Sequence, residues 1–135
     1  MRLFYLFFLV PLLFSCNTET KPKPNKEVIS RAELSQDSKI FLGNRLFSEK
    51  TCITCHAIDT RKIGPSVIEI MTVYKEQKGD IVQFLQGNAK PILDTDTAQI
   101  AIMQANIDGF LKDISVVELD AISTYMLHVD ELQAK

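Results

Sequence analysis

The stretch TCITCHAID, residues 51–59, places two thiols and an imidazole within five consecutive positions, from Cys52 to His56. Cys52, Cys55 and His56 could ligate zinc, or the two cysteines could cycle between dithiol and disulfide. The three residues could also hold a haem. Each alternative predicts different companion residues elsewhere in the chain, so the rest of the sequence has to be weighed against them.

A structural zinc site needs a fourth ligand, which usually comes from a second Cys or His pair at short spacing. The remaining histidine and cysteine of the chain are His128 and Cys16, and neither belongs to such a pair. A thioredoxin-like dithiol normally follows a strand in an α/β pattern, and no stretch here alternates as a strand should. The zinc and dithiol alternatives therefore stay open, although the sequence lacks the ligand pair and the strand that usually accompany them.

The Cys-x-x-Cys-His spacing suits covalent attachment of a haem. Two thiols three positions apart on a short turn can each add to one vinyl group of the haem. The adjacent His56 then supplies a nitrogen ligand to the iron. We therefore favour one covalently attached haem c, bound through Cys52 and Cys55, as the cofactor.

Composition bounds the remaining possibilities. A chain of 135 residues has room for one domain of ordinary size, and 46% hydrophobic with 24% charged residues is typical of a foldable soluble chain. The formal net charge of −2 gives no electrostatic reason to expect a nucleic acid as partner. We expect no nucleic-acid binding.

The N-terminus has the pattern of a signal peptide. MRLFYLFFLVPLLFS, residues 1–15, has one Arg ahead of an apolar run that is too short to span a bilayer. The stretch LFSC resembles the lipobox of bacterial lipoproteins, in which the Cys becomes the diacylated N-terminal residue. Leu13, Ser15 and Cys16 fit this pattern, whereas Phe14 is bulkier than usual. We expect cleavage after residue 15 and lipidation of Cys16; the alternative is an ordinary secretory signal.

The residues that follow Cys16 are expected to form a flexible tether. They are polar and contain two Lys-Pro pairs, and no sustained apolar period begins before about residue 34. We therefore divide the chain into a signal peptide (1–15), a lipidated Cys with tether (16–37) and a folded domain (38–135). The expected location is periplasmic, as a lipoprotein anchored to the inner or the outer membrane. With Cys16, Cys52 and Cys55 all modified, no free thiol would remain in an oxidising compartment.

The folded domain is expected to be helical, because its apolar residues recur at helical spacing. Ser38 is a plausible cap for the first helix, and Pro65 is expected near the first turn of the second. Asp80 should begin the third helix, and Ser115 with Glu118 should form a capping box on the last. The expected helices cover residues 38–50, 65–79, 80–88, a turn or two within 96–107, and 115–132.

With these features in place, residues 38–132 resemble a class I monohaem cytochrome c. Gly43 and Phe47 resemble the small and aromatic residues with which that family crosses its N-terminal helix over the last one. Ile122 and Tyr125 resemble the receiving pair. The resemblance implies an all-α cytochrome c fold, in which four to five short helices surround one covalently bound haem and the terminal helices cross.

The resemblance also implies roles around the haem. KIGPSV contains the Gly-Pro that follows the haem-binding His in the family, where the carbonyl of Pro65 accepts a hydrogen bond from His56 and orients it. Tyr74 is similar in place to aromatic residues that pack near the haem. IMQANI precedes the last helix, where the family supplies its sixth iron ligand. Met103 is the expected ligand, although Gln104 follows it where a Pro often stands.

Other residues could compete with Met103 as the sixth ligand. Met71 and Met126 lie at helical spacing and are expected to fill the core. His128, near a helix end, is more simply a surface histidine favoured by the helix dipole.

Ligation by His56 and Met103 would leave the iron no open position for a substrate. We therefore expect a single-electron carrier and not an enzyme, with no small-molecule substrate. It would be a monomer, tethered to a membrane, that shuttles electrons between respiratory or peroxidase-type partner proteins. The alternative is a haem-bearing interaction or ligand-sensing subunit of a larger complex.

Overall fold

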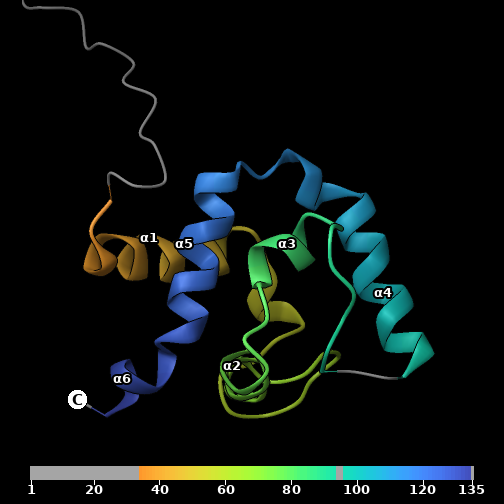
Figure 1. Cartoon of the computed structure of the whole chain (residues 1–135), viewed down its shortest axis with the longest axis horizontal. Coiled ribbons are helices and arrows are strands. Elements are labelled where there is room, and N and C mark those ends of the chain that lie inside the picture. Colours follow the sequence, from red (N-terminus) through yellow and green to blue (C-terminus); the bar gives the residue numbers. More distant parts are fainter. Residues whose placement is uncertain (1–33, 94–95, 135) are drawn as a thin grey trace, which may run out of the picture.

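The computed structural model describes residues 34–93 and 96–134 (Figure 1). The predicted signal peptide, Cys16 and most of the predicted tether lie outside the described residues. Helices form nearly all the regular structure of the described part, which has no strand; His56 and Arg61 form an isolated bridge. The helices are α1 (Gln36–Glu49), η1 (Cys52–Thr54), α2 (Val67–Glu76), α3 (Ile81–Leu85), α4 (Thr97–Asp108), η2 (Phe110–Asp113), α5 (Val116–Leu127) and α6 (Val129–Gln133).

The predicted all-α fold is thus confirmed. The segment expected to form one C-terminal helix forms two, α5 and α6, which meet at His128. The segment expected to contribute a turn or two forms the full helix α4. No helix within the described ranges is long and apolar enough to span a membrane.

Two of the predicted helix starts are correct. The side chain of Asp80 accepts a hydrogen bond from the backbone N–H of Gln83 and caps α3. At α5, the Ser115 side chain accepts from the backbone of Glu118, and the Glu118 carboxylate accepts from the Ser115 N–H at 2.9 Å. This reciprocal pair is a capping box.

The other two starts are wrong. α1 begins at Gln36, and Ser35 caps it because Ser35 has extended backbone and accepts from the N–H of Ser38. Pro65 lies ahead of α2 and not in its first turn, because Ser66 is the cap and forms a capping box with Glu69. The Ser-x-x-Glu spacing at Ser66 is the sequence signal for this start.

The terminal helices α1 and α5 cross (Figure 1). Gly43 of α1 faces the backbone of Ala121 in α5, and a Cβ at position 43 would overlap the Ala121 carbonyl oxygen. The rings of Phe47 and Tyr125 pack across the same contact in a tilted arrangement, with centroids 5.5 Å apart and an interplanar angle of 57°, and Ile122 is also buried. Close backbone approach and a buried aromatic pair therefore hold the two ends of the domain together.

An ion pair also joins these helices. The ammonium of Lys39 in α1 lies 2.8 Å from a carboxylate oxygen of Asp120 in α5, and Asp120 is buried. Removing one partner of such a pair would leave the other charge poorly solvated. The pair therefore reinforces the register of the crossing.

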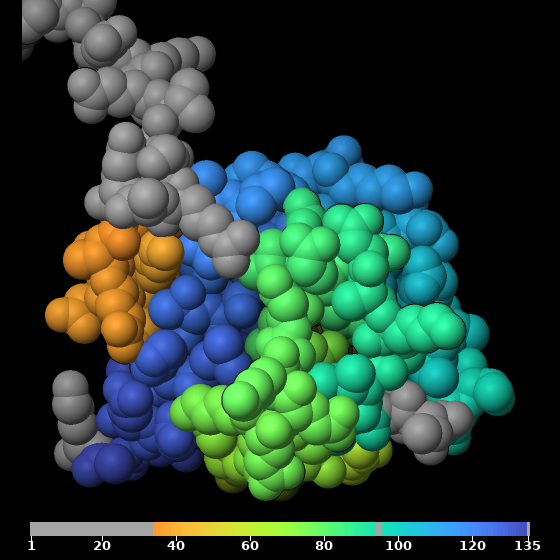
Figure 2. Space-filling model, viewed as in Figure 1, coloured from red at the N-terminus to blue at the C-terminus, as the bar shows by residue number. Residues whose placement is uncertain are grey.

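The core consists of two clusters with a pocket between them. Buried residues of α1, α2 and α5 form the larger cluster, and residues around η2 with Val82 and Leu119 form the smaller one. In the space-filling view, α3 and the residues that follow it lie between α5 and α4 on the face shown (Figure 2). The helices thus surround a hollow whose lining comes from both clusters.

Candidate haem site

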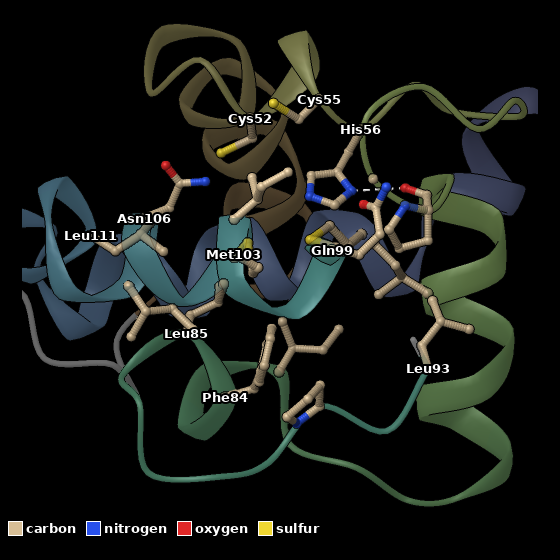
Figure 3. Close-up of a pocket in the computed structure, with 18 of the residues that line it drawn as sticks. Cys52, Cys55, His56, Phe84, Leu85, Leu93, Gln99, Met103, Asn106 and Leu111 are labelled. Atoms are coloured by element: carbon tan, nitrogen blue, oxygen red, sulfur yellow. Dashed lines mark hydrogen bonds between the residues drawn. The ribbon is translucent and has the colours of Figure 1, made fainter. Parts of the chain in front are cut away.

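The Cys-x-x-Cys-His segment forms a tight turn directly after α1. The N–H groups of Cys55 and His56 both donate to the carbonyl of Cys52, at 3.2 and 3.0 Å. Thr51 enters the turn with a positive φ of 63°, an uncommon backbone for a β-branched residue. Its carbonyl accepts from the hydroxyl of Thr54 at 2.7 Å, which ties the turn to itself. One turn thereby brings Cys52, Cys55 and His56 to the same wall of the pocket (Figure 3).

The ring of His56 is held in one orientation. Its Nδ1 lies 2.7 Å from the carbonyl oxygen of Pro65, and because a carbonyl can only accept, Nδ1 carries the proton and donates. Nε2 is then left with a lone pair that is free to bind a metal. This is the hydrogen bond between His56 and Pro65 that the resemblance implied, and it fixes both the tautomer and the direction of the ring.

Gly64 makes room for the His56 ring. A Cβ at position 64 would lie 2.5 Å from Cε1 and 2.9 Å from Nδ1 of His56. The N–H of Gly64 donates to the carbonyl of Cys55 at 3.0 Å, so the backbone cannot easily move away. The Gly-Pro pair therefore acts twice on His56, through the missing side chain of Gly64 and through the Pro65 carbonyl.

The pocket has a volume of about 200 Å³ and a mostly apolar lining. Cys52 and Cys55 lie at one end, and Phe84 and Leu93 lie at the other (Figure 3). Met103 of α4 projects into the space between these ends (Figure 3). An apolar slot with thiols at one end and metal-binding atoms inside it is suited to a large flat macrocycle.

The structure separates the competing candidates for the sixth ligand. Met103 lines the pocket that His56 also lines, and so does Met126, whereas Met71 is buried in the core and does not line it. His128 lies elsewhere: its Nδ1 donates to the carbonyl of Thr124 at 2.7 Å, and its Nε2 accepts from Gln36 at 2.9 Å. Both nitrogens of His128 are thus engaged near the junction of α5 and α6.

Polar side chains on α4 were missed by reasoning from the sequence. Gln99, Met103 and Asn106 are all half-buried and line the pocket, with the two amides on either side of Met103 along the helix (Figure 3). Their spacing of four and three residues places them on one helical face, which is the signal that could have found them. Tyr74 also lines the pocket, as the resemblance implied.

The dithiol and zinc alternatives find little support in the geometry. Burial raises the pKa of the Cys52 thiol, whereas a redox-active or nucleophilic cysteine needs a lowered one. In the part of the chain that the structure describes, no three His, Cys, Asp or Glu side chains are grouped to hold a metal ion. The choice among the three kinds of chemistry rests on the comparison with known proteins.

The family model described as Cytochrome c matches residues 41–130. The chain therefore belongs to the cytochrome c family, whose members transfer electrons through haem, and its cofactor is covalently bound haem c. A similar protein is cytochrome c-551 of Azotobacter vinelandii, with 43% identity over 37 residues. That match covers 27% of this chain and 45% of the Azotobacter protein, which is less than half of its length.

The residues that line the pocket fit a haem, independently of the family match. Two thiols stand on one turn, an oriented imidazole follows them, and the missing side chain of Gly64 keeps the space beside the ring clear. The remaining lining is apolar apart from hydroxyl and amide groups. These residues would hold the macrocycle by its edge, by its iron and by its two faces.

Proposed function

We propose that this chain is a class I, single-haem electron carrier whose haem is attached through Cys52 and Cys55 and whose iron is ligated by His56 and Met103. The observation that carries this proposal is that Met103, on α4, lines the same pocket as the oriented imidazole of His56. The haem iron supplies the one-electron chemistry. If His56 and Met103 both ligated the iron, no position on it would remain for a substrate.

The side chains have separate tasks in this proposal. The hydrogen bond from His56 to Pro65 fixes the tautomer of the imidazole and prevents its rotation. The thioether of Met103 is a soft ligand that favours the ferrous state and raises the potential. Apolar residues from both core clusters keep water away from the haem, which limits the rearrangement of solvent when the charge of the iron changes.

The visible and near-infrared spectra test the ligands. Wild-type protein, made together with the haem-attachment machinery, should give a low-spin c-type spectrum and a thioether haemochrome in alkaline pyridine. Ferric protein should show the weak near-infrared band of sulfur ligation. Met103→Ala should lose this band, whereas Met126→Leu, which changes the other methionine of the pocket, should keep it. Loss of the band in Met126→Leu alone would overturn the assignment of Met103.

Carbon monoxide distinguishes a carrier from a ligand sensor. Ferrous wild-type protein should bind it weakly, because Met103 has to leave first, and Met103→Ala should bind it at least tenfold more tightly. Tight, reversible binding by the wild type would contradict the carrier and favour a haem-bearing sensing subunit of a larger complex.

We further propose that the domain is a periplasmic monomer held to a membrane by lipid on Cys16, and that it meets respiratory or peroxidase-type redox partners. The support is the signal pattern of residues 1–15 with LFSC at its end, and the polar segment 16–37. Cys16→Ser should move the protein from the detergent phase to the aqueous phase in phase partition. Unchanged partition of this variant would contradict the anchor and leave the haem ligands untouched.

A further inference from the structure

One peptide unit connects His56 to a carboxylate that lies outside the pocket lining. The unit between Pro65 and Ser66 presents its carbonyl oxygen to Nδ1 of His56 at 2.7 Å, a hydrogen bond drawn as a dashed line in Figure 3. Its N–H, which belongs to Ser66, donates to Oε2 of Glu69 at 2.8 Å. Because a trans peptide unit is planar, with its oxygen and its hydrogen on opposite sides, the two hydrogen bonds hold the same unit from both ends.

The carboxylate of Glu69 is itself held in place. Its second oxygen, Oε1, accepts a hydrogen bond from Nε of Arg61 at 2.8 Å, and its backbone N–H donates to the hydroxyl oxygen of Ser66 at 3.2 Å. The backbone of Arg61 in turn forms the isolated bridge with His56. Although its side chain is partly exposed, Glu69 is therefore fixed next to the Ser66 N–H.

Glu69 carries a negative charge in this arrangement. The hydrogen bond from Arg61 is the main cause that lowers the pKa of Glu69, and the hydrogen bond from the Ser66 N–H adds to it. The carboxyl group is therefore ionised at neutral pH. Ser66 is 2% exposed, so water competes little for the N–H that Glu69 accepts.

A negative charge at the N–H end of a peptide unit affects its carbonyl end. Hydrogen bonds in a chain polarise one another, so an ionised acceptor at the N–H makes the carbonyl oxygen a stronger acceptor. A stronger acceptor at Nδ1 makes an imidazole a better electron donor through Nε2, which favours ferric iron. Metal-bound histidines often donate directly to a carboxylate; here the peptide unit stands between the two groups.

We propose that Glu69 is a positioning residue for the haem iron: through the peptide unit of Pro65 and Ser66 it strengthens the hydrogen bond that orients His56, and thereby lowers the reduction potential. This inference rests on the proposed ligation of the iron by His56. The Ser-x-x-Glu motif of residues 66–69 thus has a role beyond capping α2.

The same motif at the start of α5 provides a matched control. Glu118 forms the same kind of capping box and also pairs with a lysine. The peptide unit whose N–H Glu118 accepts carries the carbonyl of Ile114, and neither Ile114 nor Glu118 lines the described pocket. Glu118 therefore shares the helix cap and the ion pair with Glu69, but the peptide unit that it holds is not the one that orients His56.

Glu69→Gln tests the proposal, and Glu118→Gln is its control. Each variant keeps an acceptor at the helix cap and removes one negative charge. Two quantities are measured on the haem-loaded proteins at neutral pH: the reduction potential, and the rate at which the Nδ1 proton of His56 exchanges with solvent. The exchange is followed through the paramagnetically shifted NMR resonance of this proton in ferric protein. It reports on the hydrogen bond itself, which a changed electric field at the iron would not alter.

In Glu69→Gln we expect a higher reduction potential and an Nδ1 proton that exchanges about threefold faster or more. Glu118→Gln should match the wild type in both quantities. Faster exchange together with a higher potential, confined to Glu69→Gln, is the supporting result.

A wild-type exchange rate in Glu69→Gln would overturn the proposal whether or not the potential moves, because the peptide unit would then not transmit the charge. Faster exchange at an unchanged potential would overturn it too, as would equal changes in the two variants. Failure of the underlying ligation is distinguishable, because ferric wild-type protein would then show no paramagnetically shifted imidazole resonance of His56.

Discussion

Gly43 in α1 lies directly against the backbone carbonyl of Ala121 in α5, with no space for a side chain between them. The contact joins residues 78 positions apart in the chain. Because the rings of Phe47 and Tyr125 pack next to it, this approach of two backbones sets how closely α1 and α5 pack. The haem pocket is built on the same pair of helices, since Phe47 and Ile122 line it.

Gly43→Ala should therefore destabilise the domain. In an exposed helix position the same change stabilises by up to about 1 kcal/mol, whereas here the added methyl group forces the helices apart at a cost of about 1–3 kcal/mol. Chemical denaturation followed by circular dichroism measures the difference. Asn44→Ala, at the exposed neighbouring position, should change the free energy of unfolding by less than about 0.5 kcal/mol. Equal stability of Gly43→Ala and wild type would contradict the close contact.

Most helices and the haem-binding turn could be predicted from the sequence because their signals are local. Apolar residues at helical spacing, the capping box of Ser115 and the cap at Asp80 all act within a few residues. The Cys-x-x-Cys-His spacing is itself a geometric constraint, and the structure gives it the turn that it requires.

Features that depend on distant contacts could not be predicted in this way. The first turn of α1 starts at Gln36, whose side-chain amide donates to His128, 92 positions later in the chain. A local rule cannot choose between Ser35 and Ser38 as the cap when this contact is unknown. Gln99 and Asn106 share a helical face with Met103, but this spacing marks them as pocket residues only if Met103 itself faces the pocket, and that depends on the orientation of α4.

Gly64→Ala should disturb iron ligation more than overall folding. The new Cβ would collide with the His56 ring and weaken the hydrogen bond between His56 and Pro65. We expect a loss of about 1–3 kcal/mol in the free energy of unfolding, with an altered reduction potential and a weaker near-infrared sulfur band. Voltammetry and ferric spectra of the haem-loaded protein measure these effects.

Pro65→Ala is the control for this change, because it keeps the carbonyl that accepts from His56. Its potential should stay closer to the wild-type value than that of Gly64→Ala. If Pro65→Ala shifted the reduction potential more than Gly64→Ala, the ring of Pro65, and not the position of His56, would govern the ligation of the iron.

The capping box of α5 should make stability depend on pH in the acid range. The backbone N–H of Ser115 is the main cause that lowers the pKa of Glu118, and Lys50 at 3.1 Å adds to it. A carboxylate with a lowered folded pKa adds stability that is fully present above its unfolded value of about 4.3 and is lost as pH falls through the folded pKa. Because Glu118 is partly exposed, we expect this contribution to be below about 1 kcal/mol.

Glu118→Gln isolates this contribution. Gln can still complete the capping box but carries no charge, so the stability gap between wild type and variant should narrow as pH falls below about 4.3, through the lowered folded pKa of Glu118. Acid effects on the haem ligands are common to both proteins and cancel in the difference. Glu76→Gln, which changes an exposed carboxylate at the last position of α2, should give a smaller pH-dependent gap. A gap for Glu118→Gln that does not narrow as pH falls below about 4.3 would contradict the assignment.

The haem should be required for the fold itself. The pocket of about 200 Å³ would cost up to about 5 kcal/mol if it stayed empty, at roughly 24 cal/mol per Å³. That loss is comparable with the whole stability of a small domain, about 5–15 kcal/mol. The double variant Cys52→Ser/Cys55→Ser should therefore lose most of its helical circular dichroism and its cooperative unfolding transition.

Cys16→Ser is the control, since it removes a thiol outside the described domain and should keep the haem and the helical signal. The helix crossing argues against unfolding of the haem-free domain, because Gly43, Phe47 and Tyr125 pack at this crossing without the haem. If those contacts were sufficient, the double variant would keep a native-like spectrum and a sharp transition. The prediction is that they are not sufficient, since α3 and α4 line the pocket across from the crossing and would lose what they pack against.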